Sequence, residues 1–130
     1  MSRPKIWVNG CFDILHIGHL MLLQYASMLG VVKVGLDSDD RIKKRKGSNR
    51  TFHFLEERTK IIEAIRYVDS VVSFNTDDEL ESHIKDWGTS IIVVGNDYTV
   101  KDVVGADTVE SVVLFTKYKD FSTTKIMQYG

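Results

Sequence analysis

The segment VNGCFDILHIGHL, residues 8–20, begins at the last residue of an apolar run and continues with the turn signal Asn9-Gly10. Further along it, His16 and His19 stand on either side of Gly18. If a helix begins near Ile17, His16 lies at its mouth and His19 in its first turn. Backbone N–H groups at a helix start lack partners, and the helix dipole favours an anion there. Gly18 lets a ligand approach the backbone. The segment therefore predicts a strand, a glycine turn and a helix start that faces a phosphate.

The rest of the chain alternates apolar runs with segments of helical spacing. Five runs predict buried strands: Lys5–Val8, Val31–Leu36, Ser70–Phe74, Ile91–Val94 and Ser111–Thr116. Helical spacing recurs in residues 20–29, 55–68 and 77–87, and the last of these has Thr76 as N-cap and Gly88 as stop. This order predicts an α/β fold in a single domain, a Rossmann-like, doubly wound parallel five-stranded sheet with helices on both faces. Ligands of such sheets bind beyond the carboxyl ends of the strands.

The bulk properties restrict the function. A chain of 130 residues is one domain's worth. Its 17 Lys and Arg against 18 Asp and Glu provide no overall positive field for a nucleic acid. One cysteine excludes an internal disulfide, and neither a signal peptide nor a membrane span is visible. We expect a soluble, cytoplasmic protein with no nucleic acid and no membrane as partner.

One segment is compositionally unusual. RIKKRKGSNR, Arg41–Arg50, carries six basic residues in ten and includes the turn formers Gly47, Ser48 and Asn49. A charge run is usually a solvated face. Because this one follows the second expected strand, a mobile loop that clamps phosphate is the alternative. The sequence leaves both interpretations open.

The histidine pair has two alternative interpretations besides a phosphate site, namely a zinc site and core packing. Cys11, Asp13, His16 and His19 could supply the ligands of a structural zinc, but no second Cys or His pair follows. A zinc-dependent hydrolase built on Cys11, His16 and His19 is a related alternative. Core packing suits one histidine better than two that flank a glycine at a helix start. A phosphate site is the interpretation we favour.

Two motifs carry a resemblance to a known family. GCFDILHIGH resembles the HxGH signature of the cytidylyltransferase-like nucleotidyltransferases, and FSTTKI, Phe121–Ile126, is similar to their second signature. Two motifs in this order make the match specific, whereas HxGH alone is weak. The resemblance extends from Ile6 to Ile126 and implies transfer of a nucleoside monophosphate from an NTP to a phosphorylated small molecule, with Mg²⁺ and release of pyrophosphate. It also implies a homodimer.

Two branches of this family compete. NGCFDILH, KGSNR at residues 46–50, GNDY at residues 95–98 and VVGADTVE at residues 103–110 resemble the adenylyltransferase domain of ADP-heptose synthases. ERTKIIEAIRYVD, residues 57–69, is closer to glycerol-3-phosphate cytidylyltransferases. We expect ATP ahead of CTP, with heptose 1-phosphate or another small sugar or polyol phosphate as acceptor. A non-catalytic nucleotide-binding module is a further alternative.

The resemblance assigns roles to particular residues. His16 and His19 hold the α and β phosphates, and proximity to phosphate favours the charged imidazole. Lys46, with Lys44 as second choice, reaches over the triphosphate, and Arg58 adds a planar fork for phosphate oxygens, unless it forms an ordinary helix salt bridge. The full set of expected catalytic residues is His16, His19, Lys46, Arg58 and Thr123, and the expected nucleotide contacts are Gly10, Cys11, Phe12, Gly18, Arg66, Asp97, Lys117, Phe121 and Ser122.

Three of these expectations have plain alternatives. Ser122 and Thr123 either bind the outgoing pyrophosphate or simply cap a last helix. Arg66 either contacts the nucleotide or complements a helix end. Asp97 equally suits a turn. Asp13 is expected to bind Mg²⁺ through water, because a triphosphate brings its own ion and the protein needs to supply few ligands.

Overall fold

The structure, a computed structural model, describes residues 3–46, 52–95 and 102–116, with only the backbone of Lys46. Its centre is one parallel sheet with the strand order β3-β2-β1-β4-β5. The strands are β1 (Lys5–Gly10), β2 (Val31–Asp37), β3 (Ser70–Phe74), β4 (Ile91–Gly95) and β5 (Ser111–Phe115). The α/β, Rossmann-like fold class predicted from the sequence is confirmed, and each strand lies within two residues of its expected bounds.

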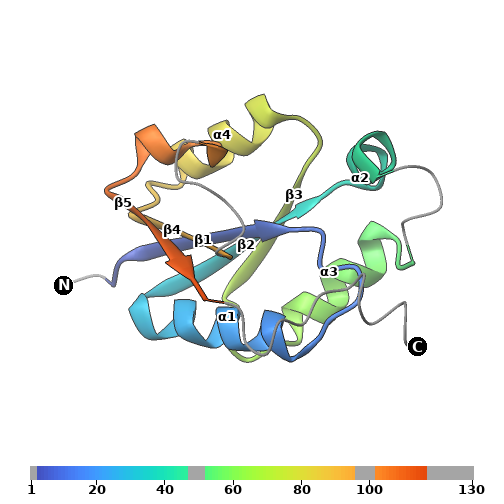
Figure 1. Ribbon diagram of the computed structural model, residues 1–130, viewed down its shortest axis with the longest axis horizontal. Coiled ribbons are helices and arrows are strands. Elements are labelled where there is room, and N and C mark those ends of the chain that lie inside the picture. The colour runs from blue at the N-terminus through green and yellow to red at the C-terminus, as the bar shows by residue number, and fades with distance from the viewer. Residues whose placement is uncertain (1–2, 47–51, 96–101, 117–130) are drawn as a thin grey trace.

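Helices cover both faces of the sheet (Figure 1). On one face α1 (Ile17–Leu29) and α3 (Leu55–Glu63) pack against β1, β2 and β3. On the other face lies α4 (Asp77–Asp86), followed along the chain by the short 3-10 helix η2 (Ala106–Thr108). No helix in the described ranges is both long and apolar enough to cross a lipid bilayer.

Alternation along β1 divides the core into two layers. Ile6 and Val8 lie in the layer with α1 and α3, whereas Trp7 points to the α4 side and packs with Ile84. Trp7 is fully buried and requires Gly35 on β2 beside it, because a Cβ at that position would lie 2.4 Å from the indole Cζ2. The apolar runs therefore form strands that are buried on both faces, as expected for a parallel sheet.

The strand order reverses direction between β1 and β4. β1 pairs with β2 along its whole length, from Lys5↔Val31 to Gly10↔Leu36. Its pairing with β4 covers only Ile6↔Ile91 and Trp7↔Ile92. The carboxyl ends of β1 and β4 are therefore not hydrogen-bonded to each other at the point where ligands of doubly wound sheets usually bind.

The basic run differs from its expected form. Its first six residues belong to helix α2 (Asp39–Lys46), so a loop was the wrong expectation for Arg41–Lys46, while residues 47–50 lie outside the described ranges. Ser38 starts the helix, since Arg41 N–H donates to Ser38 Oγ at 3.1 Å and Ile42 N–H to Ser38 O at 3.0 Å. Two aspartates in the first turn complement the helix dipole.

The other helices follow the sequence signals closely. Glu79 N–H donates to Thr76 Oγ1 at 3.1 Å, which confirms Thr76 as the N-cap of α4. Gly88, with φ of 75°, follows the helix in the left-handed region, as its position predicts. The helix expected over residues 55–68 is shorter, because α3 ends at Glu63 and turns lead from there to β3.

Candidate active site

Two histidines cap the start of α1 in a reciprocal arrangement. His16 is the N-cap residue, and the backbone N–H of Gly18 donates to its Nδ1 at 3.1 Å. The backbone N–H of His16 in turn donates to Nδ1 of His19 at 3.2 Å. This is a capping box in which imidazoles replace the usual hydroxyl and carboxylate. The rings stack with centroids 3.8 Å apart and planes at 25°.

The capping geometry determines which ring nitrogen carries a proton. A backbone N–H can only donate, so Nδ1 of both His16 and His19 must accept and is unprotonated. Each neutral ring then carries its proton on Nε2. A charged imidazole has no acceptor nitrogen, and two stacked cations at this distance would repel. In this arrangement both rings present Nε2–H as a donor, and the charged imidazole expected beside a bound phosphate stays a prediction.

The same geometry changes the part that the backbone plays. The N–H groups of Gly18 and His16 are already bonded to the two imidazoles. An anion at the mouth of α1 would therefore meet side-chain donors before these backbone groups. Because the ring centroids are only 3.8 Å apart, two neighbouring phosphate oxygens can reach both rings. The pair fits a polyphosphate in size.

Phe12 shapes the turn that delivers these histidines. Its φ of 47° is the only positive φ among non-glycine residues of the described ranges, and strain of this kind concentrates at functional sites. The ring is 8% exposed and meets His19 edge-on with centroids 5.1 Å apart. It also limits Gly10, where a Cβ would lie 3.2 Å from the Phe12 ring. Gly10 and Phe12 therefore fix the turn and support the ring of His19.

Arg58 is placed differently from its expectation. The side chain is fully buried, and its guanidinium donates to Cys11 O at 3.0 Å, Asp37 O at 2.8 Å and His53 O at 3.1 Å. It also pairs with Asp39 Oδ1 at 2.7 Å. Its partner in the ion pair is not a neighbour on its own helix, and the expected phosphate fork stays a prediction. Arg58 ties the turn after β1 to the end of β2 and the start of α2.

Asp13 likewise serves the backbone. Its two carboxylate oxygens accept the N–H groups of Phe52 at 2.7 Å and His53 at 2.6 Å, and the residue is 8% exposed. Both oxygens thus hold the segment before α3, and the expected contact of Asp13 with Mg²⁺ through water stays a prediction. No group of three His, Cys, Asp or Glu residues within the described part of the chain could hold a metal ion.

Asp37, the last residue of β2, links the site to α2; the sequence placed it in a candidate segment, residues 37–50, but assigned it no role of its own. Cys11 Sγ donates to Asp37 Oδ2 at 3.1 Å, and Arg41 Nε donates to Asp37 Oδ1 at 2.8 Å. Arg41 also reaches Asp77 Oδ1 at 2.6 Å. Burial alone would lower the pKa of Arg41, but its hydrogen bonds with Asp77 and Asp37 outweigh burial and raise the pKa above the usual value.

A sequence signal for Asp37 existed. It comes at the end of an apolar run, at the edge of the sheet where ligand sites form. In the structure it is only 4% exposed. Its partner Cys11 was predicted as a nucleotide contact, and the two now form one hydrogen-bonded unit beside the histidine turn.

The remaining predicted residues divide into two groups. Arg66 lies between α3 and β3, near the amino end of β3, whereas the histidines lie beyond the carboxyl end of β1. Within one chain the structure does not bring Arg66 to the histidines. Six predicted positions lie outside what the structure describes, one of them for its side chain only: Lys46, Asp97, Lys117, Phe121, Ser122 and Thr123. Their roles stay predictions.

The chain is similar to proteins of a known family. The family model of cytidylyltransferase-like proteins matches residues 7–128. The chain is 42% identical to the bifunctional protein HldE of Campylobacter fetus over 97% of its own length, and 43% identical to HldE of Helicobacter hepaticus over 98%. It spans only 28% and 27% of the length of these two relatives.

A solved structure supports the fold independently. A lipopolysaccharide core biosynthesis protein from Thermoplasma volcanium aligns with a TM-score of 0.74, covering 91% of this chain and 100% of that one at 20% identity. At this identity the likeness concerns the fold alone. The family itself rests on the family model, which covers almost the whole chain and both motifs recognised in the sequence. The chain therefore belongs to the cytidylyltransferase-like family of nucleotidyltransferases.

Proposed function

We propose that this chain transfers a nucleoside monophosphate, AMP from ATP ahead of CMP from CTP, to a small sugar or polyol phosphate such as heptose 1-phosphate. The support is the similarity to two HldE proteins at 42% and 43% identity, together with the segments that resemble ADP-heptose synthases. Because the chain spans little more than a quarter of those relatives, the activity of the whole HldE protein is not assumed for it.

The single observation that carries the proposal is the stacked pair of imidazoles at the start of α1. A phosphate oxygen of the acceptor attacks the α-phosphorus of the NTP. The bond from that phosphorus to the bridging oxygen breaks, and pyrophosphate leaves with the electron pair. Such a reaction needs positioning and donors aimed at the oxygens where negative charge develops. The two Nε2–H groups are donors of this kind, held in place by the capping box.

The metal enters as part of the nucleotide in this proposal. Mg²⁺ bound to the triphosphate neutralises charge on its oxygens. Because both oxygens of Asp13 accept from the backbone of Phe52 and His53, no step of the proposed reaction depends on an ion held by the protein. This chain's own contribution is to bind and align the phosphates.

The test is release of pyrophosphate, measured as inorganic phosphate in the presence of pyrophosphatase. Each of ATP, CTP, GTP and UTP is combined with Mg²⁺ and either an aldose 1-phosphate, including heptose 1-phosphate, or glycerol 3-phosphate. Acceptor-dependent release that is fastest with ATP and a sugar 1-phosphate is the expected result. A preference for CTP and glycerol 3-phosphate would establish the cytidylyl alternative, which residues 57–69 favour. No release with any pair, alongside clear nucleotide binding, would leave a non-catalytic module.

The nucleotide preference and the expected homodimer are tested by separate measurements. A thermal-shift screen with the four NTPs should show the largest rise in apparent melting temperature with the preferred nucleotide, because ligands that bind the folded state stabilise it by mass action. The homodimer implied by the family resemblance is checked by the molar mass in solution.

A further inference from the structure

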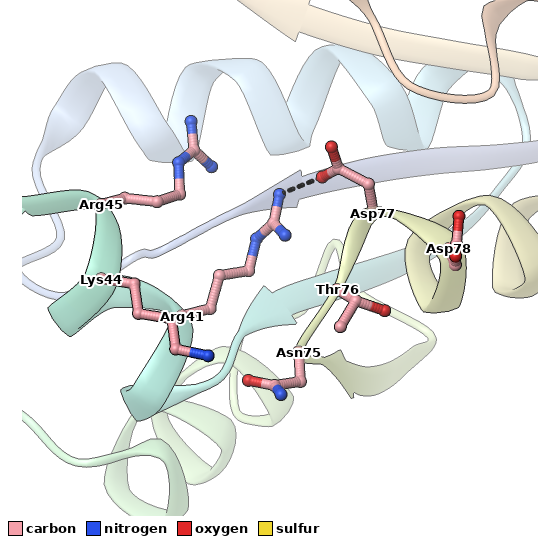
Figure 2. A pocket seen from close by; sticks show the side chains of 7 residues that line it. All are labelled: Arg41, Lys44, Arg45, Asn75, Thr76, Asp77 and Asp78. Carbon is pink, nitrogen blue, oxygen red and sulfur yellow. Dashed lines mark hydrogen bonds and ion pairs between the residues drawn. The ribbon is translucent and has the colours of Figure 1, made fainter.

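A pocket lined by charged and polar residues lies between α2 and the turn that joins β3 to α4 (Figure 2). One wall consists of Arg41, Lys44 and Arg45 from α2, and the other of residues 75–78. Lys44 and Arg45 extend on either side of Arg41, which points across the pocket to Asp77 (Figure 2). The pocket therefore places a basic wall opposite one that carries an amide, a hydroxyl and two carboxylates.

Some of these groups are committed to the fold, and others remain for a ligand. Arg41 is fixed by Asp37 and Asp77, and Asn75 Oδ1 accepts the Ser38 hydroxyl at 2.7 Å. By contrast, the side chains of Lys44, Arg45 and Asp78 form no hydrogen bond or ion pair with any part of the chain that the structure describes. Two cations and one carboxylate are thus available around a fixed centre.

The lining indicates the chemistry of a ligand. No aromatic or long aliphatic side chain lines the pocket, so a nucleobase would find no surface on which to stack. Lysine and arginine suit a phosphate, and carboxylate and amide groups suit hydroxyls, which both donate and accept. A phosphorylated molecule rich in hydroxyl groups matches both walls.

The pocket is connected to the histidine turn through one carboxylate. Asp37 accepts from Cys11 on that turn at 3.1 Å and from Arg41 on the pocket wall at 2.8 Å. Two hydrogen bonds therefore separate the pocket from the segment that leads into His16. The pocket wall and the histidine turn thus share one buried partner, Asp37.

We propose that this α2–α4 pocket is the acceptor subsite, and that it takes a small phosphorylated polyol or sugar, an inference that rests on the proposed function. Lys44 and Arg45 attract the phosphate group, Asp78 and the Asn75 amide bind hydroxyls, and Arg41 keeps the two walls at a fixed separation. Lys44 accordingly serves the acceptor and not the triphosphate.

The experiment compares pocket variants with matched controls on the same helices. Lys44→Gln and Asp78→Ala alter the pocket, whereas Lys43→Gln on α2 and Glu81→Gln on α4 alter exposed residues that do not line it. Each pocket variant should raise KM for the acceptor by about tenfold, the loss of one good charged hydrogen bond, with KM for the NTP within about twofold. Both controls should behave as wild type. A rise in KM for the NTP alone, or no change in either constant, would overturn the proposal.

A binding measurement without NTP separates this inference from the proposed function. Calorimetric titrations of the wild-type protein and of Asp78→Ala use mannose 1-phosphate, glycerol 3-phosphate and inorganic phosphate as probes. Weaker binding of one of the two organic phosphates by Asp78→Ala, with no such effect on inorganic phosphate, supports the subsite even if no turnover is found. Equal binding of all three probes, or none of the organic phosphates bound, overturns it. Failure of the proposed function appears instead as absence of pyrophosphate release in the wild-type protein.

Discussion

At the scale of single residues, His16 and His19 use their two ring nitrogens differently. Nδ1 accepts a backbone N–H and builds the start of α1, which leaves the proton on Nε2. The site and the helix start are thus the same structure, so a substitution that removes the whole ring disturbs both. The two roles can be separated by a side chain that has an acceptor where Nδ1 lies and no donor where Nε2–H lies.

Arg58 makes contacts that the sequence did not predict, and its expected role as a phosphate fork stays a prediction. A buried guanidinium donating to three carbonyl oxygens and to Asp39 should be essential for stability. Arg58→Met, which keeps much of the volume, should lower the free energy of unfolding by about 3–5 kcal/mol, because it leaves one buried and three partly buried oxygens without this donor. Urea denaturation followed by circular dichroism measures it. Unchanged stability with a raised KM for the NTP would instead support the phosphate fork.

Gly35 makes a second prediction at this scale. An added Cβ would lie 2.4 Å from a fully buried Trp7 ring that has no room to move. Gly35→Ala should therefore cost about 1–3 kcal/mol of stability, typical of overpacking in a core. Ser73→Ala on the exposed side of β3 is the control and should change stability by less than about 0.5 kcal/mol. Equal unfolding midpoints for the two variants would contradict the packing described around Trp7.

At the scale of elements, α2 is the helix that was not predicted from the sequence. Six basic residues in ten and three turn formers suggested a loop, but Ser38, Asp39 and Asp40 form a helix-start signature just before them. Its inner contacts could not be read from the sequence. Arg41 bridges Asp37 and Asp77 and lies over the Phe74 ring, 5.0 Å from its centroid, and these partners come from other elements.

The attachment of α2 can be tested by a double-mutant cycle. Arg41→Gln should cost more stability than Asp77→Asn, because Arg41 also serves the buried Asp37, whereas the side chain of Asp77 is 66% exposed. Their coupling should be about 0.2–1 kcal/mol, the range for pairs with an exposed partner. Chemical denaturation of the four proteins gives the coupling. Equal costs for both single variants would show that Asp37 does not hold Arg41.

At the scale of the whole molecule, the sequence predicted the sheet because apolar runs and helical spacing are local patterns. Strand bounds and the Thr76 cap followed from residues a few positions apart. The candidate site was predictable only as far as its parts are local too, which holds for the histidine pair. The links from Arg58 to Cys11, and from Asp13 to Phe52, join residues about forty or more positions apart. Only the folded chain reveals them.

We propose that Nε2–H of His16 acts on the phosphates while its Nδ1 builds the helix start, and His16→Asn tests this division of roles most directly. Asparagine is a strong N-cap residue, so the apparent melting temperature should stay close to that of wild type, whereas His16→Ala should lose about 1 kcal/mol of stability. Both variants should lower kcat for pyrophosphate release by about 100-fold or more, the usual cost of a lost transition-state donor. Wild-type kcat in His16→Asn would contradict the account.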